Sequence, residues 1–406
     1  MTIKHAAILP LIGGSVLASH QAFGVAPEYI MTYEGFQDNE SHLLNYYKTV
    51  HNNDLQYHYI DRGDRPTSKV DVVSTICPCA GLSQLSHGFG TANPNNQWMV
   101  RTAQYVLGEL KPEVFWGENA PGFAGKIGAD IRNQVKKIGD DNGYSMTVYR
   151  TKSLLHGTAQ VRERSFYFFW KGTKTPLLGY YNRPWDKIED VIRNARSNTM
   201  QEPISAKTPS KDDPYYRFIL EEMFGGITHR QFSHEKMEFL KVRSNDTFSF
   251  LEQQGYDYKT IGAWLEKEGY DREVKKCEYK YAKLAAGGNV MRRGTIVPKD
   301  FIGAFVGHYP SMLTHPDEDR YINYREALSI MGMPTDFELL NPKKSANHIC
   351  QNVPVKTATD MAHEVNEVLL GNRPYLDSNY TYQVNVHRTH EIWEEKERKT
   401  IVDFLV

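Results

Sequence analysis

The stretch Val72-Val73-Ser74-Thr75-Ile76-Cys77-Pro78-Cys79-Ala80-Gly81-Leu82-Ser83 decides how this sequence is interpreted. Its first five residues predict a buried strand, and the small residues after Pro78 predict a loop. A cysteine at the carboxyl end of a parallel strand lies where α/β proteins bind ligands, and it can act as a nucleophile. Taken alone, Cys79 has a rival interpretation as a buried, unreactive cysteine.

Strand-like and helix-like segments alternate over the first 170 residues. We expect strands at residues 6–12, 28–34, 57–60, 70–76, 114–118, 145–151 and 164–170. We expect helices at residues 15–23, 40–50, 96–110, 125–138 and, near the C-terminus, 358–370. This order predicts an α/β fold with a mostly parallel sheet, helices on both faces, and ligand-binding loops at one edge.

The apolar stretch after Lys4 has two interpretations. Residues 5–19 resemble a signal peptide, with a short apolar segment followed by small residues. The alternative is a first strand and a turn at Gly13-Gly14, which we favour because free cysteines follow. No other run is long and apolar enough to predict a membrane span.

Length and charge limit the class of protein. A chain of 406 residues predicts two lobes, and a net charge of −1 means that a nucleic acid would have to meet a local basic patch. Cys77, Cys79, Cys277 and Cys350 show no zinc-binding spacing, and the first two are too close for an ordinary disulfide. We therefore expect a reducing, cytoplasmic environment and no metal.

The composition changes after about residue 185. A polar, proline-containing stretch at residues 197–213 precedes short helical patterns with aromatic and basic residues. We expect a catalytic domain at residues 1–185, a smaller domain at 186–337, and a segment at 338–406 that returns to the first domain.

Further motifs follow Cys79 in a fixed order. They are Gly117-Glu118-Asn119-Ala120-Pro121-Gly122, Gln160-Val161-Arg162-Glu163-Arg164, Arg325-Glu326, Met331-Gly332-Met333-Pro334 and Ile349-Cys350-Gln351-Asn352-Val353-Pro354. Together with Pro78-Cys79 they resemble the DNA cytosine-5 methyltransferase family over nearly all of the chain outside residues 182–312. Ordered agreement of several motifs is far more specific than any one of them.

The resemblance implies a Rossmann-like S-adenosylmethionine-dependent methyltransferase fold with a smaller target recognition domain. It implies methyl transfer from S-adenosyl-L-methionine to carbon 5 of a flipped cytosine in double-stranded DNA, through a covalent Cys79 adduct. Glu118, expected in an apolar pocket, would hold a proton for N3 of cytosine. Arg162 and Arg164, with Gln160, would contact O2 and a phosphate. Ser83 and Asn119 would complete the substrate site.

The family's donor site is implied at Leu9, Ile12, Gly13, Gly14, Glu34, Asp61, Pro78 and Gln351, with Asp64 as an alternative to Asp61. Several of these positions depart from the family pattern. In its Phe-x-Gly-x-Gly-Gly motif, Leu9 replaces the aromatic residue and Leu11 replaces the first glycine. Gly35 stands where an aromatic residue often covers adenine, and Cys350-Gln351 replaces Gly-Asn. These changes indicate either sequence drift, which we favour, or a pocket for a modified or different one-carbon donor.

A cluster of basic residues lies in the region that selects the target. It comprises Lys275, Lys276, Arg292 and Arg293, with Lys280, Lys283, Tyr279 and Tyr281 nearby. These side chains could hold phosphates and contact base edges. Because Glu273 and Glu278 interrupt the run, a solvated helix face is an equal alternative.

Two other functions stay open. One is a catalytically silent DNA-binding homologue, which would not need Cys79, Glu118, Arg162 and Arg164. The other is RNA methylation, although the Cys-Phe-Thr segment of the transfer-RNA branch is not present in the variable region. We expect a monomer in a bacterial or phage-infected cell. Restriction protection, phage self-protection and gene regulation all stay open as its role.

Overall fold

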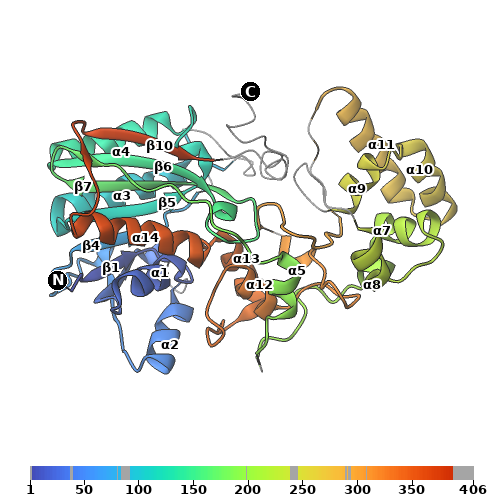
Figure 1. The fold of residues 1–406 in the computed structure, drawn as a ribbon, viewed down its shortest axis with the longest axis horizontal. Coiled ribbons are helices and arrows are strands. Elements are labelled where there is room, and N and C mark those ends of the chain that lie inside the picture. The colour runs from blue at the N-terminus through green and yellow to red at the C-terminus, as the bar shows by residue number, and fades with distance from the viewer. Residues whose placement is uncertain are drawn as a thin grey trace, which may run out of the picture. The chain divides into compact units, whose positions relative to one another are not determined.

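The computed structural model describes residues 2–36, 40–79, 81–83, 92–197, 199–237, 246–288, 290, 294–307 and 309–386. The chain divides into two compact units (Figure 1). The first comprises Met1–Thr158, Arg162–Trp185 and Met331–Val386, and the second contains Ala159–Val161 and Asp186–Ile330. Among the described residues, no helix is long and apolar enough to cross a membrane.

Within the described residues, the first unit is built on one eight-stranded sheet in the order β10-β6-β7-β5-β4-β1-β2-β3. The strands are β1 (His5–Ile8), β2 (Tyr29–Thr32), β3 (Gln56–Tyr59), β4 (Val72–Thr75), β5 (Val114–Asn119), β6 (Tyr144–Lys152), β7 (Glu163–Lys171) and β10 (Tyr380–Asn385). Only β7 runs antiparallel to its neighbours in this sheet. The predicted mostly parallel sheet of an α/β fold is therefore confirmed.

One end of the chain folds as expected and the other adds a strand that was not expected. The stretch that resembles a signal peptide forms β1, the favoured alternative, inside the sheet between β4 and β2, where His5–Ile8 are buried throughout. The edge strand β10, whose burial alternates with exposure only in part, was not predicted. Its pairing partner β6 lies more than 200 residues earlier in the chain, so no local pattern identified it.

Helices cover both faces of the sheet. They are α1 (Gly14–Phe23), α3 (Gln97–Tyr105), α4 (Ala129–Asp141) and α14 (Val355–Leu369). The unit also contains α2 (Ser41–Val50) and α13 (Pro342–Gln351). α3 and α4 bury Met99 and Val135 against Phe115 and Phe169 of the sheet, whereas α1 and α14 pack together (Figure 1). α4 begins at Ala129 rather than at the predicted residue 125, because residues 125–128 form bends and turns. A two-stranded sheet of β8 (Thr175–Pro176) and β9 (Tyr375–Leu376) completes this unit.

The topology brings the predicted site to one edge. β1 to β5 run parallel, so the segments that follow them leave from the same edge of the sheet. These segments contain the loop at residues 9–13, Glu34, Asp61 and Cys79, and β5 ends there with Glu118-Asn119. Ligands bind in sheets of this kind at such an edge.

The second unit is mainly helical. Its helices are α5 (Ile188–Arg193), α6 (Pro209–Asp212), α7 (Pro214–Phe218), α8 (His229–Gln231), α9 (Thr247–Gln253), α10 (Tyr258–Lys267), α11 (Asp271–Ala285) and α12 (Tyr324–Ile330). Aromatic side chains dominate its core, among them Tyr216, Phe232, Phe248 and Trp264. The unit thus has a hydrophobic core of its own.

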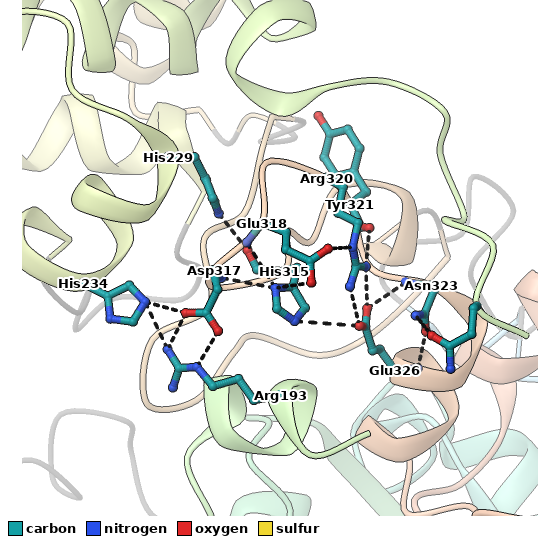
Figure 2. A network of polar contacts seen from close by, with 11 residues as sticks. Arg193, His229, His234, His315, Asp317, Glu318, Arg320, Tyr321, Asn323 and Glu326 are labelled. Carbon is teal, nitrogen blue, oxygen red and sulfur yellow. Dashed lines mark hydrogen bonds and ion pairs between the residues drawn. The ribbon is translucent and has the colours of Figure 1, made fainter. Parts of the chain in front are cut away.

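A polar network holds the start of α12, where the Arg325-Glu326 motif lies (Figure 2). The buried Glu326 carboxylate accepts hydrogen bonds from Arg320 at 2.8 and 3.0 Å and from the Asn323 amide at 2.8 Å. The Asn323 side chain in turn accepts from the Glu326 amide at 2.8 Å. This reciprocal arrangement satisfies donors at the helix N-terminus. Glu326 therefore orders the end of the second unit.

The buried imidazole of His5 predicts a dependence of stability on pH. Burial, and to a smaller degree the charge of His20, lowers the pKa of His5 to about 4. Its Nε2 donates to the Val25 carbonyl at 2.9 Å, which raises the pKa, but burial outweighs this contact and the folded protein holds the neutral ring. Between pH 6.5, the ordinary value, and about 4, the unfolded chain binds the proton more strongly, and stability is lost as pH falls.

We expect His5→Gln to reduce this pH dependence by about one proton, or about 1.4 kcal/mol per pH unit. Urea unfolding at a series of pH values between neutrality and 4.5 measures it. The exposed His363 offers a matched His363→Gln control. A wild-type slope in the His5 variant would contradict the assignment.

Candidate active site

Cys79 lies on a tightly packed loop after β4. Its side chain is half-buried, and its carbonyl accepts a hydrogen bond from the Leu82 amide at 3.0 Å. A Cβ on Gly81 would lie 2.2 Å from Asn96 Oδ1, and one on Gly122 would lie 2.3 Å from the Leu82 carbonyl oxygen. Two glycines far apart in the chain therefore let the base of the cysteine loop pack closely.

The two neighbouring cysteines have different surroundings. Cys77 is fully buried, with its sulfur 3.4 Å from Thr75 Oγ1 and 3.8 Å from Thr102 Oγ1. Burial raises the pKa of Cys77, which keeps it a thiol. Cys79 is partly open to solvent, so it is the one of the two that a substrate can reach.

Glu118 forms a buried ion pair. Its Oε1 lies 2.5 Å from Arg164 Nε, and its side chain is 3% exposed. β5 and β7 bring the pair together, since Glu118 faces Phe166 across the antiparallel ladder. The sequence predicted an apolar pocket, but the structure gives the Glu118 carboxylate a cationic neighbour, because a buried carboxylate needs a partner.

Arg162 is buried beside this pair. Its Nη1 donates to the Cys350 carbonyl at 2.7 Å and its Nη2 to the Asn352 carbonyl at 3.0 Å. Burial and then the charge of Arg164 lower the pKa of Arg162, while Glu118 and Cys79 act in the opposite direction. The other three predicted catalytic residues thus lie within electrostatic range of Arg162, which also donates hydrogen bonds to the main chain of the 350–352 segment.

The predicted substrate residues Asn119 and Gln160 contact the main chain. Asn119 Nδ2 donates to the Cys77 carbonyl at 3.4 Å, and its Oδ1 accepts from the Ala120 amide at 2.8 Å. Gln160 lies in the second unit, where its Oε1 accepts from the Phe305 amide at 3.3 Å. Asn119 therefore ties the end of β5 to the cysteine loop, and Ser83 lies half-buried on that loop.

The loop between β1 and α1 keeps left-handed backbone at residues that are not glycine. Leu9 has φ 52° and Leu11 has φ 54°, followed by Gly13 at 101°. A left-handed leucine costs about 1 kcal/mol or more, so packing imposes this conformation. Leu11, which replaces the first glycine of the family motif, therefore keeps a left-handed backbone of the kind that glycine adopts.

Packing explains both glycines and the buried Ile12 in this loop. A Cβ on Gly13 would lie 2.3 Å from Leu43 Cδ1, and one on Gly14 would lie 2.3 Å from the Val353 carbonyl oxygen. Pro78 lies on the same edge, immediately before Cys79.

Carboxylates follow the next two strands. Asp61 accepts from the Glu34 amide at 3.1 and 3.2 Å, and the exposed Glu34 carboxylate accepts from Arg62 Nε at 2.7 Å. Gly35 carries no aromatic ring, as the sequence shows, but the next residue does. There the half-buried Phe36 packs edge-on against Trp98, with ring centroids 4.8 Å apart.

The sequence analysis missed Asn352. Its Oδ1 accepts from the Gly14 amide at 2.9 Å, and its carbonyl accepts from Arg162. Asparagine is a preferred acceptor for helix N-terminal amides, which is the signal that could have identified it. The predicted Gln351 is instead exposed at the last position of α13. Asn352 therefore joins the start of α1 to Arg162.

The predicted DNA-contacting residues are partly described. Lys275 and Lys276 are exposed on α11, whereas Arg292 and Arg293 lie outside the described residues. Lys280 is half-buried above the rings of Tyr215 and Phe248, and Tyr281 donates to the Tyr256 carbonyl at 2.9 Å. Lys280 and Tyr281 therefore pack against or hydrogen-bond to the interior of the second unit rather than facing solvent. In the described part of the chain, no three His, Cys, Asp or Glu side chains could hold a metal ion.

Comparisons with known proteins agree with this architecture. The model of the C-5 cytosine-specific DNA methylase family matches residues 12–367. A putative DNA modification methyltransferase encoded within an E. coli prophage is similar over 91% of this chain and 99% of its own, with 15% identity and a TM-score of 0.53. The Entamoeba histolytica methyltransferase EhMeth covers 91% and 99%, with 12% identity and a TM-score of 0.50. Among curated proteins, none matches the sequence significantly.

Gly122 offers a test of the cysteine loop. We expect Gly122→Ala to push the Leu82 carbonyl away and displace Cys79, which lowers activity at least tenfold, about 1.4 kcal/mol in the barrier. A Cβ on Gly108 would meet only Asn142 Oδ1, at 3.9 Å, which is an ordinary contact, so Gly108→Ala is the matched control. Equal rates for the two variants in a single-turnover assay would refute the packing argument.

Asn352 offers a test of the link to α1. We expect Asn352→Ala to leave the buried Gly14 amide without its acceptor and to lower the free energy of unfolding by about 1–3 kcal/mol. Asn352→Asp retains an acceptor oxygen and should recover part of that loss. Urea unfolding of the three proteins measures it, and equal losses for both variants would show that the hydrogen bond is unimportant.

Proposed function

This chain belongs to the C-5 cytosine-specific DNA methylase family, and we propose that it methylates carbon 5 of a flipped cytosine in double-stranded DNA. One observation supports the proposal most. The half-buried Cys79 follows β4 within electrostatic range of Arg162, and the Glu118–Arg164 pair lies beside them. A protein that only bound DNA would not need a nucleophile in such a site.

The residues have distinct chemical roles in this proposal. The Cys79 thiolate adds to carbon 6 of cytosine, which makes carbon 5 nucleophilic. Glu118 in its protonated form donates a hydrogen bond to N3, which offsets the negative charge that develops on the ring, and Arg164 fixes the orientation of its carboxyl group. After carbon 5 has taken the methyl group, solvent water accepts the proton from carbon 5. The electron pair of that bond re-forms the carbon 5–carbon 6 double bond, and the thiolate leaves carbon 6. The buried positive charge of Arg162 favours the anionic groups throughout.

The residues at the donor edge fit S-adenosylmethionine, which the family uses and which would supply an electrophilic methyl group. The carboxylates of Glu34 and Asp61 follow neighbouring strands and provide acceptors for ribose hydroxyls and an amino group. Phe36 supplies an aromatic surface beside them. The left-handed Leu11 favours the ordinary donor over a modified one, since the backbone there is still the kind that glycine adopts.

Mass spectrometry of nucleosides tests the reaction. DNA incubated with the protein and S-adenosylmethionine should contain 5-methylcytosine, and Cys79→Ser should abolish it. Cys77→Ser is a matched control, because Thr75 and Thr102 can hydrogen-bond the new hydroxyl, and it should remain active. If the folded wild-type protein modified transfer RNA but not DNA, the proposed DNA substrate would be wrong and RNA would take its place. Formation of 5-methylcytosine by Cys79→Ser would show that Cys79 is not the nucleophile.

A further inference from the structure

Three consecutive helices of the second unit, α9, α10 and α11, are joined by two similar turns (Figure 1). The sequence Gly-Tyr-Asp occurs at residues 255–257 and again at 269–271. Gly255 has φ 79° and Gly269 has φ 80°, so both turns use left-handed glycine. In each turn, the tyrosine amide donates to a carbonyl five residues earlier, at 3.0 and 2.8 Å. The chain therefore ends a helix and starts the next one twice in the same way.

The helices share one side of a common core. Trp264 and Leu265 of α10 lie in the same hydrophobic cluster as Cys277 of α11, with Leu284 packed against it. Tyr270, from the turn between them, stacks on Trp264 with centroids 6.2 Å apart. Two packed helices joined by a three-residue turn that contains glycine are typical of a helix-turn-helix. α9 supplies the third helix of such a module.

The opposite side of α11 is basic and exposed. Arg272, Lys275, Lys276, Tyr279 and Lys283 are spaced at i, i+3, i+4, i+7 and i+11, which places them on one helix face. All five are exposed, and Tyr279 is 61% exposed. We call these five residues the α11 stripe.

The acidic residues of α11 lie outside this stripe. Helical spacing places Glu273 and Glu278 on its two flanks, and Glu273 pairs with Lys276. Glu273 and Glu278 therefore interrupt the basic residues along the sequence but not on the helix face that carries the α11 stripe. A stripe with four cations and no anion, on a protein of net charge −1, complements a polyanion locally.

We propose that α9 to α11 form a helix-turn-helix module in which α11 enters the major groove of double-stranded DNA. Arg272, Lys275, Lys276 and Lys283 contact phosphates, and Tyr279 contacts base edges. With 15 residues, α11 is about 22 Å long, and the major groove, about 12 Å wide, admits a helix. The deep, narrow major groove of A-form RNA does not, so the geometry favours DNA. This inference rests on the proposed function and assigns its target-reading element.

Salt-dependent binding tests the α11 stripe. Fluorescence anisotropy with a short labelled DNA duplex of random sequence gives the slope of log affinity against log salt. Lys275→Ala/Lys276→Ala should reduce the magnitude of the slope by about 2, or about 0.9 for each lost phosphate contact. Lys136→Ala/Lys137→Ala removes two adjacent lysines from α4 and should leave the slope unchanged. Lys283→Ala alone should reduce it by about 1.

Two results would overturn the inference. One is a wild-type slope in the Lys275/Lys276 variant, and the other is tighter stripe-dependent binding of transfer RNA than of the duplex. Formation of 5-methylcytosine is measured separately on the same proteins. If the wild-type protein methylates DNA and the Lys275/Lys276 variant keeps the wild-type slope, only the proposed role of α11 is refuted. A reduced slope without any methylation would refute the proposed function and support α11 as the DNA-binding helix.

Discussion

The buried guanidinium of Arg162 is the interaction on which the first unit's site depends. It joins the start of β7 to the main chain of residues 350–352, which lie almost 190 positions later. A charge in the interior is tolerated only when hydrogen bonds replace its water, and two carbonyl oxygens do so here. Asn352, held by one of these bonds, accepts in turn from Gly14 at the start of α1. The nucleophile's surroundings and the β1–α1 loop are thus one connected structure.

This connection orders the charges around Cys79. Two guanidinium groups and one carboxylate are buried together, and the Glu118–Arg164 pair leaves Arg162 as the second cation. A net positive site suits a reaction whose attacking sulfur and activated ring are anionic. It also explains why Glu118, which has a partner, can stay in place in the interior without an apolar pocket. The main-chain contacts of Asn119 and Gly122 then hold the cysteine loop against β5.

Local patterns predicted most of the sheet and the residues at its edge. Strand and helix periodicity located β1 to β7, and the ordered motifs located Cys79, Glu118, Arg162 and Arg164. Long-range partners could not be predicted in this way. Asn352 contacts Gly14 across 338 residues, and β10 pairs with β6 near the end of the chain. A single sequence also does not show that Arg164 pairs with Glu118, or that Glu273 and Glu278 lie beside the basic face of α11.

The proposed reaction depends on a covalent bond between Cys79 and cytosine. DNA that contains 5-fluorocytosine tests it most directly, because fluorine at carbon 5 cannot leave as a proton does and the adduct persists. The protein is incubated with this DNA and S-adenosylmethionine, digested, and analysed by peptide mass spectrometry. The account predicts a nucleotide adduct on the peptide that contains Cys79. An adduct on Cys77, Cys277 or Cys350, or methylation of ordinary DNA without any trapped adduct, would contradict it.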